Sequence, residues 1–348
     1  MAGATPQLIK ELREMTGAGM LDCKNALNET DGDLEKAVQA LREAGLGKAA
    51  KKAGNIAAEG VIAVKVNENN NVATMLELNA QTDFVAKNEN FLNLTQEILS
   101  HAQANNIVDA EALASSTISG TSFSDFLNGK IATIGENLVA RKLVTVTGTV
   151  VNAYVHTNGR VGVLLAASCD EAAKDKAAIL LKSLAMHASA MKPTVISYTD
   201  LDPAFVESEN RAIVAEITAD NDELKRLGKT LKNIPDFVSR SQLTESAIAN
   251  AKAAFEAELK EQGKPEKIWA NIIPGKIERY ITDNTQLDGR FALLSQAYVM
   301  NDKITVEQAI AEVDASIVIT EYIRFELGEG IEKKEEDFAA EVAKQMGK

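Results

Sequence analysis

The sequence predicts an α+β fold built from more than one domain, and three observations support this. The chain has 348 residues, which is more than one hydrophobic core usually organises. Apolar residues recur at helical spacing near the N-terminus, then change to the alternation of β-strands from Gly60, and alternate again from about Arg141. Each alternating stretch precedes a helical one, so we expect two α+β subdomains of antiparallel hairpins and helices.

The expected domains follow from these changes of period. They are a three-helix domain at 1–47, a linker at 48–59, a first α+β subdomain at 60–141, a second at 142–197 and 280–328, an inserted helical hairpin or coiled coil at 198–279, and a C-terminal helical module at 329–348.

The first segment predicts three short helices. Thr5 and Pro6 form a typical helix start, because a capping hydroxyl precedes a proline at the first helical position. Two glycines in Thr16–Gly19 permit a turn. The second helix should turn Met20, Cys23, Ala26 and Leu27 inward, and the third should end at Gly45.

The first alternating stretch predicts a β-hairpin. Ile62, Val64 and Val66 alternate with polar residues, "NENNN" turns the chain, and alternation resumes from Val72 to Leu78. Two helices follow, which carry one apolar face each (Phe91, Leu94 and Ile98; Phe123, Leu127, Ile131 and Ile134).

The second alternating stretch predicts another hairpin. The strand-like run "RKLVTVTGTVVNAYVH" leads to Asn158-Gly159, the strongest short hairpin signal, and "VGVLLAAS" returns. A long helix closed by Pro193 comes next. The strand "SIVITEYIRFEL" and a C-terminal helix after a glycine break complete the chain.

Two amphipathic helices are expected between Pro203 and Gly263. Ile213, Ile217, Leu224, Leu227, Leu231 and Ile234 follow a four-three spacing, and Pro235 ends that run. Ile248, Phe255 and Leu259 form a second stripe. Two such helices joined by a short break predict a helical hairpin or coiled coil.

Composition restricts the function classes. The formal net charge is −13, which argues against direct nucleic-acid binding, because phosphate neutralisation needs a basic surface. We interpret the local cluster Lys48, Lys51 and Lys52 as a solvated linker. No apolar run could span a bilayer and no signal sequence is recognisable, so we expect no membrane association. Two distant cysteines, Cys23 and Cys169, indicate a reducing cytoplasm.

Motifs for catalysis or cofactor binding are missing from the sequence. It has no phosphate-binding P-loop, no metal-ligand spacing among two cysteines and three histidines, and no nucleophile elbow. We interpret His187, between apolar neighbours on a predicted helix, as a packing residue. His156 lies at a hairpin tip, where recognition residues are common, although a lone histidine there is usually incidental. We therefore expect neither an enzyme nor a cofactor.

The stretch Asn79–Lys87, "NAQTDFVAK", is unusual. It follows a predicted strand, where a loop should be polar, yet it places Phe84 beside Asp83. Two interpretations are open: Phe84 folds back under its own hairpin, or it is exposed because it packs into a partner.

Several blocks carry a resemblance to a known family. "KELREMTGAGMLDCKNAL", "AAKKAGNIAAEGV", "LELNAQTDFVAKN", "IGENLVARK", "HTNGRVGVLLAAS" and "YIRFELGEGIEKKEEDFAAEV" together resemble the bacterial translation elongation factor Ts family. The resemblance implies a guanine nucleotide exchange factor that binds GDP-bound and nucleotide-free elongation factor Tu, displaces Mg²⁺ and promotes GDP release. It also implies that the three-helix domain is UBA-like and that the inserted hairpin, here longer than in shorter family members, is of a dimerisation type.

The resemblance also implies roles for particular residues. Thr82, Asp83, Phe84 and Val85 would insert near the Mg²⁺ site of Tu, supported by Ile134 and Gly135. Arg13, Met20 and Leu21 would dock on its nucleotide-binding domain, His156 would contact another part of Tu, and the C-terminal helix would return to the nucleotide-binding domain.

Two other functions stay open at this point. A pure interaction scaffold would bind Tu without accelerating GDP release, and an enzyme would need polar groups converging on His156 or His187. The sequence also leaves open a homodimer or a 2:2 complex with Tu.

Overall fold

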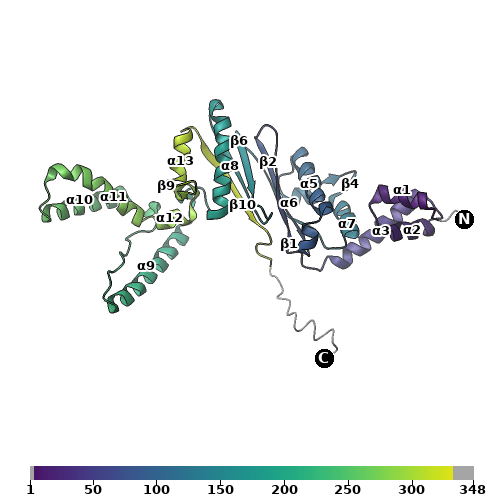
Figure 1. The fold of residues 1–348 in the computed structure, drawn as a ribbon, viewed down its shortest axis with the longest axis horizontal. Helices are drawn as coiled ribbons and strands as arrows, with labels where there is room; N and C mark the ends of the chain where they lie inside the picture. Colours follow the sequence, from purple (N-terminus) through teal and green to yellow (C-terminus); the bar gives the residue numbers. More distant parts are fainter. Residues whose placement is uncertain (1–3, 332–348) are drawn as a thin grey trace. The chain divides into compact units, whose positions relative to one another are not determined.

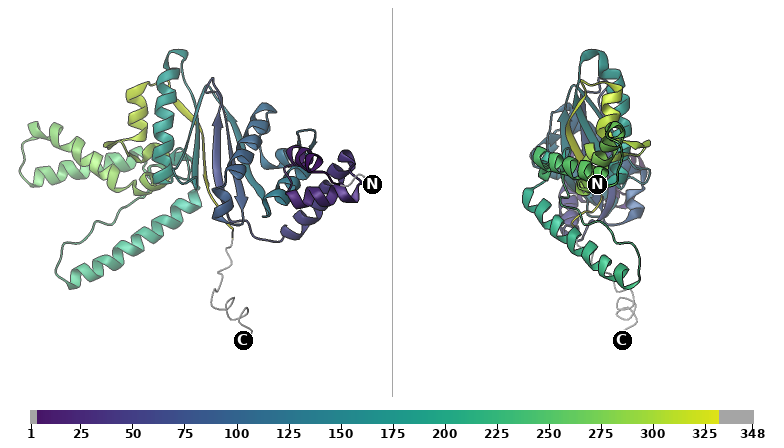
Figure 2. Two further views of the ribbon diagram at one scale, coloured as in Figure 1. Left: turned by 45° about the vertical axis from the view of Figure 1, so that its right-hand side comes forward. Right: turned by 90° about the vertical axis from the view of Figure 1, so that its left-hand side faces the viewer.

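The computed structural model describes residues 4–331, and it confirms the predicted α+β class. The predicted C-terminal helix lies outside the described residues. The chain divides into two compact units, one formed by residues 1–164 with 323–348 and the other by residues 165–322. Figures 1 and 2 show the elements of both units, which are described separately below.

The first unit begins with three helices, as predicted: α1 (Pro6–Thr16), α2 (Met20–Glu29) and α3 (Leu34–Lys52). The Thr5 side chain caps α1 by accepting a hydrogen bond from the Leu8 N–H, and Gly17 ends it in a left-handed conformation with φ 66°. Leu12, Cys23, Ala26, Leu27 and Ala37 form a small buried core between the helices.

Two predictions for this segment are wrong. Helix α3 does not end at Gly45 but continues to Lys52, so part of the predicted linker is helical. Gly45 instead allows close packing on α7 (Phe123–Ile134), because a Cβ at Gly45 would lie only 3.3 Å from the Ala132 Cβ. Met20 does not point inward, since it is 63% exposed.

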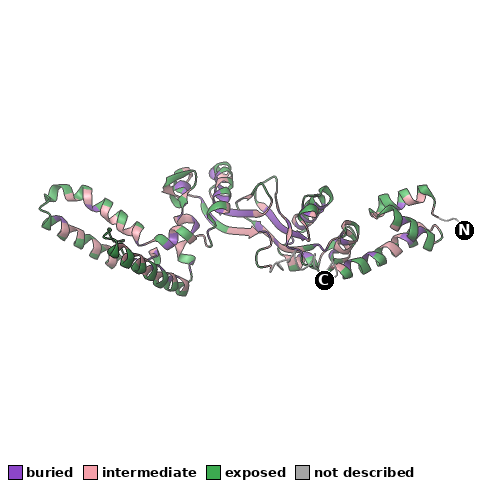
Figure 3. Ribbon diagram, turned by 60° about the horizontal axis from the view of Figure 1, so that its bottom comes forward, coloured by how far each residue is buried: buried purple, intermediate pink, exposed green. Residues whose placement is uncertain are grey.

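The first predicted hairpin is confirmed. Strand β1 (Glu59–Val66) pairs antiparallel with β2 (Val72–Ala80), and β2 pairs antiparallel with β5 (Val139–Thr147), in the order β1-β2-β5. The predicted helices are α5 (Glu89–Ala104) and α7, with the short elements α4 (Asp83–Ala86), α6 (Ala110–Ala114), β3 (Thr117–Ile118) and β4 (Thr121–Ser122) between strands and helices. Leu76 and Leu78 share one core with Phe91, Ile98 and Ile131, and Figure 3 colours much of the sheet as buried.

The run 141–156, predicted as one strand-like stretch, divides into two strands. Strand β5 belongs to the first sheet throughout, so the predicted subdomain boundary after Arg141 falls inside a strand. Strand β6 (Val150–Val155) joins β7 (Val161–Ser168) and β10 (Val318–Glu326) in a sheet of order β10-β7-β6. The predicted turn at Asn158-Gly159 is confirmed, with φ 67° at Gly159.

The second unit is mainly helical. Its helices are α8 (Lys174–Met191), α9 (Pro203–Arg226), α10 (Glu245–Glu261), α11 (Trp269–Asp283), α12 (Gln286–Phe291) and α13 (Val306–Val313), with the hairpin β8 (Ala297–Tyr298) and β9 (Asn301–Thr305). Short 3₁₀ turns lie at 171–173, 198–200, 240–242, 266–268 and 293–295.

The predicted helix through Ile234 is too long. Helix α9 ends at Arg226, and Leu227, Leu231 and Ile234 are 54%, 51% and 43% exposed. The chain turns back after Gly228, because the Asn221 side chain donates to the Lys232 carbonyl at 2.8 Å and accepts from its N–H at 2.7 Å. These local bonds replace further helical ones.

The predicted pairing of α9 with α10 is also wrong, since α10 packs on α11 instead (Figure 1). The Phe255 and Tyr280 rings meet edge to face with centroids 6.3 Å apart, and the Lys276 ammonium lies 2.6 Å from the Glu258 carboxylate. Helix α11 contains Pro274, which disguises its helical pattern in the sequence.

His187 packs inside the second unit, as predicted. It is fully buried, its Nδ1 accepts a hydrogen bond from the Val299 N–H at 3.2 Å, and its Nε2 lies 3.0 Å from the Gln296 Oε1. This pattern requires Nδ1 to be unprotonated, so the ring is the neutral tautomer with hydrogen on Nε2. Burial lowers the pKa of His187 below its ordinary value of 6.5.

This burial predicts that the second unit loses stability in acid. Because the folded pKa is lowered, the unfolded chain binds the proton first as the pH falls. The contribution of His187 is therefore complete above pH 6.5 and decreases below it, by at most about 1.4 kcal/mol per pH unit. Urea unfolding followed by the fluorescence of Trp269, the only tryptophan, should show this loss between about pH 7.5 and 5. His187→Gln should flatten it, and an unchanged pH dependence in that variant would contradict the assignment.

Candidate functional site

The motif Thr82–Val85 forms the turn between strand β2 and helix α5. Thr82 caps the single-turn helix α4, because its hydroxyl accepts a hydrogen bond from the Val85 N–H at 3.3 Å. Val85 packs against the core of the first subdomain, and Ala86 is buried. One side of the turn is therefore attached to the core, which fixes the opposite side toward solvent.

Phe84 lies on the solvent side and is 82% exposed, more than any other large apolar residue between residues 4 and 331. The interpretation in which Phe84 folds back under its own hairpin is therefore wrong. Burying a phenylalanine side chain is worth about 1.5–3 kcal/mol. The fold forgoes this contribution, so Phe84 is available to a partner.

Asp83 neighbours Phe84 and forms an ion pair with Lys87, at 2.6 Å between Oδ2 and Nζ. The hydrogen bond from Lys87 holds the pKa of Asp83 below its usual value, so the carboxylate stays ionised at neutral pH. The pair spans α4 from its first residue to the residue after it, and it orients both side chains.

A carboxylate from a distant part of the chain braces the motif. Glu136 Oε2 accepts hydrogen bonds from the Gln81 and Thr82 N–H groups, both at 3.0 Å, and Oε1 accepts from the Thr82 hydroxyl at 2.6 Å. Sequence reasoning named the neighbours Ile134 and Gly135, which end α7, and missed Glu136. The only feature of the sequence that could have pointed to Glu136 is its position within the block "IGENLVARK".

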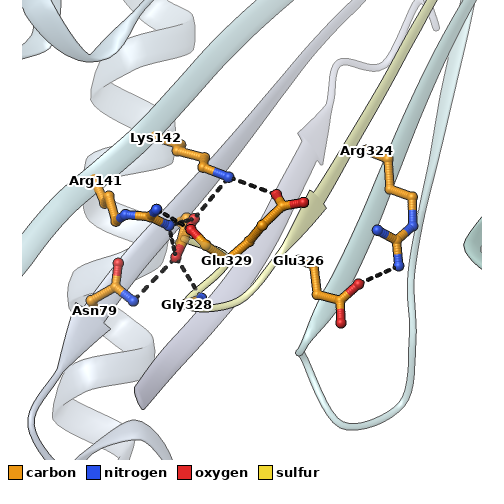
Figure 4. Close-up of polar contacts among 8 residues, drawn as sticks. Asn79, Arg141, Lys142, Arg324, Glu326, Gly328 and Glu329 are labelled. Carbon is orange, nitrogen blue, oxygen red and sulfur yellow. Dashed lines mark hydrogen bonds and ion pairs between the residues drawn. The ribbon is translucent and has the colours of Figure 1, made fainter. Parts of the chain in front are cut away.

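A second carboxylate is buried on strand β2, the strand that leads into the motif. Glu77 of β2 has no exposed side-chain surface, and Arg141 Nη1 lies 2.9 and 3.0 Å from its two oxygens. The Gly328 N–H donates to it at 2.9 Å and the Asn79 side chain at 3.2 Å. Figure 4 shows Asn79, Arg141 and Gly328 gathered with Lys142 and Glu329. Lys142 and Glu329 form an ion pair at 3.1 Å.

The Glu77 cluster fixes the end of the described chain to the first sheet. Gly328 adopts φ 72°, and a Cβ there would come within 2.8 Å of the Ala58 carbonyl oxygen, so glycine is required. Arg141 also donates to the Glu329 carbonyl. Residues 328–329 are thereby bound to the strand that carries the motif.

The candidate residues of the N-terminal domain are accessible. Met20 and Leu21 are 63% and 69% exposed at the start of α2, and Arg13 is exposed on α1. With Met15, also exposed, they place apolar side chains on either side of the turn between the two helices. No hydrogen bond or ion pair in the described part of the chain joins these residues to the motif.

His156 is exposed at the turn between β6 and β7. Its Nδ1 lies 3.4 Å from the Tyr154 hydroxyl, and the two rings meet edge to face at 6.3 Å. Among residues 4–331, no group of three His, Cys, Asp or Glu could hold a metal, and no helix is long and apolar enough to cross a membrane. His156 is therefore accessible to solvent at this turn.

Comparison with known proteins gives a consistent result. A family model described as Elongation factor TS matches residues 81–234 and 232–329. The chain is 79% identical over 348 residues to the elongation factor Ts of Aliarcobacter butzleri, with both chains fully covered. It is 53% identical to that of Campylobacter hominis and 55% identical to that of Campylobacter curvus, with 99% of each chain covered.

The buried carboxylate predicts a large cost on truncation. Glu77→Ala leaves Arg141 without its main partner in a mostly buried position, and losing one partner of such a pair costs about 3–5 kcal/mol. Urea denaturation should show this loss. Glu97→Ala, which removes a carboxylate from an exposed pair with Lys130, is the matched control and should cost less than about 1 kcal/mol. Equal effects of the two substitutions would refute the structural role of Glu77.

Proposed function

The chain belongs to the elongation factor Ts family, and from that premise we propose that it is a guanine nucleotide exchange factor for elongation factor Tu, acting in translation elongation in the cytoplasm. It binds GDP-bound Tu, displaces the Mg²⁺ ion and promotes GDP release so that GTP can bind. It is not itself an enzyme and uses no cofactor. The observation that carries this proposal is Phe84, which is 82% exposed on a braced turn.

Phe84 acts as a wedge. A close-packed protein interior does not deform freely, so inserting an aromatic ring between packed elements of the partner forces them to shift. A shift of the groups that hold Mg²⁺ weakens the bridge from the ion to the phosphates. Thr82 and Val85 hold the turn against their own core, and Asp83, paired with Lys87, maintains its geometry.

Exchange requires a difference in affinity. A GDP site of nanomolar affinity is worth about −12 kcal/mol, and each tenfold weakening needs about 1.4 kcal/mol. The coupling is reciprocal, so GDP weakens binding of the exchange factor by the same factor. One wedge supplies part of this free energy, and the remainder comes from a broad interface. Arg13, Met20 and Leu21 provide one patch of that interface, Ile134 and Gly135 support the wedge, and His156 provides another patch.

The central test is release of fluorescent GDP from cognate elongation factor Tu. The wild-type protein should accelerate release, and Phe84→Ala should reduce the acceleration roughly 10- to 100-fold, as expected for losing the burial of one aromatic side chain. Folding stability should change by less than about 0.5 kcal/mol, because Phe84 is exposed in the free protein. Leu92→Ala, which shortens an exposed apolar residue of α5, is the matched control.

Each other outcome has a definite meaning. If Phe84→Ala accelerates release as well as the wild type, the protein is an exchange factor but Phe84 is not its wedge. If the wild type binds Tu without accelerating release, the protein is an interaction scaffold instead.

The N-terminal patch should affect affinity rather than the maximal rate. Met20→Ala combined with Leu21→Ala removes apolar contact area distant in sequence from the motif. We expect the concentration for half-maximal GDP release to rise roughly tenfold, with the saturated rate unchanged. A titration of the exchange factor against labelled Tu·GDP measures both quantities. Leu46→Ala on α3 is the control, and a lower saturated rate with unchanged affinity would contradict this division of roles.

A further inference from the structure

We propose that Glu136 is the positioning residue of the exchange motif and fixes the direction in which Phe84 is presented. This inference rests on the proposed function, and it concerns a residue outside the motif and the contact patches named above. Glu136 acts through Thr82 rather than by touching the partner.

The contacts of Glu136 concentrate on the start of the motif. One oxygen accepts from two successive backbone N–H groups, those of Gln81 and Thr82, and the other accepts from the Thr82 hydroxyl. The same hydroxyl caps α4 by accepting from the Val85 N–H. The carboxylate therefore reaches the helical turn that carries Phe84 through a single intermediate residue.

Helix α4 needs such an anchor, because it consists of the four residues Asp83–Ala86. One helical turn is unstable by itself, since fixing its backbone costs more than its few hydrogen bonds return. Hydrogen bonds to a charged acceptor are the strong ones, and Glu136 receives three. Its side chain thus binds the backbone where β2 passes into α4.

Glu136 is itself held firmly. It follows Gly135, whose left-handed conformation at φ 87° ends α7 and whose N–H bonds to the Ile131 carbonyl. The next residue, the buried Asn137, donates from its side chain to the Asn55 carbonyl at 2.8 Å. The Asn55 side chain in turn donates to the Gln81 side chain at 3.3 Å. These bonds close a ring through residues 55, 81, 136 and 137, so the carboxylate is fixed relative to the motif.

Phe84 can displace groups of the partner only if the backbone that carries it stays in place. Phe84 makes little contact with its own chain, so its direction is set by the backbone of α4. Misplacing a functional group by about 1 Å can cost roughly 100-fold in rate. Both Glu136 oxygens are already engaged with the motif, which leaves the side chain a supporting role.

The test compares Glu136→Ala and Glu136→Gln with Glu97→Ala, a control that removes a carboxylate paired with Lys130 of α7. In the fluorescent GDP assay, Glu136→Ala should lower the saturated release rate roughly tenfold or more, while the half-saturating concentration changes less than about threefold. Glu136→Gln keeps the shape of the side chain but not its charge, so it should restore part of the rate.

Hydrogen–deuterium exchange of the free protein supplies a readout that does not depend on Tu. The amides of Gln81 and Thr82 should exchange faster in Glu136→Ala than in the wild type or in Glu97→Ala. The inference is overturned if these amides are unaffected or if Glu136→Ala accelerates GDP release from Tu as well as the control does. It is also overturned if the affinity of Glu136→Ala for Tu falls while the saturated rate of GDP release is kept. If the wild type fails to accelerate GDP release, the proposed function fails, and the amide measurement alone decides whether Glu136 positions the motif.

Discussion

The buried carboxylate of Glu77 is the constraint on which the arrangement of the first unit depends. A charge without exposed surface is costly unless it is paired and hydrogen-bonded, and strand β2 cannot supply the partners alone. Arg141 comes from β5, and the Gly328 N–H comes from the far end of the chain. Satisfying this one group therefore requires three segments to meet, and it fixes strand β2, which ends at Ala80, two residues before the motif Thr82–Val85.

Within the motif, the polar side chain is bound to the protein and the apolar side chain is exposed to solvent. Its polar residue Thr82 is bound twice, to Glu136 and to the backbone of its own helical turn. Its apolar residue Phe84 is left in solvent. In most surface turns the arrangement is reversed, with apolar side chains covered and polar ones free. An exposed aromatic ring on a rigid turn favours binding to a partner. The turn is already ordered in the free protein, so little conformational entropy is lost when the ring binds.

Local pattern predicted much of this fold. Alternation identified β1 and β2, Asn158-Gly159 identified the turn before β7, and helical spacing identified α5 and α7. Some failures occurred where a distant contact outweighs the local signal. Gly45 resembles a helix end, but it serves the approach of Ala132. Nothing in the local pattern singles out Glu77 or Glu136, because the Gly328 N–H and the Thr82 hydroxyl that bind them lie 251 and 54 residues away. Phe84 could be singled out because it breaks the local rule.

The bond between Glu77 and Gly328 has a consequence for synthesis on the ribosome. The two residues are 251 positions apart in the chain. At about 5–20 residues per second, Gly328 is made roughly 10–50 s after Glu77. During that interval strand β2 carries a carboxylate without its full set of partners. The nascent first unit thus completes the hydrogen bonding of this buried carboxylate only after Gly328 has been made, although its hydrophobic core is formed by residues 49–143.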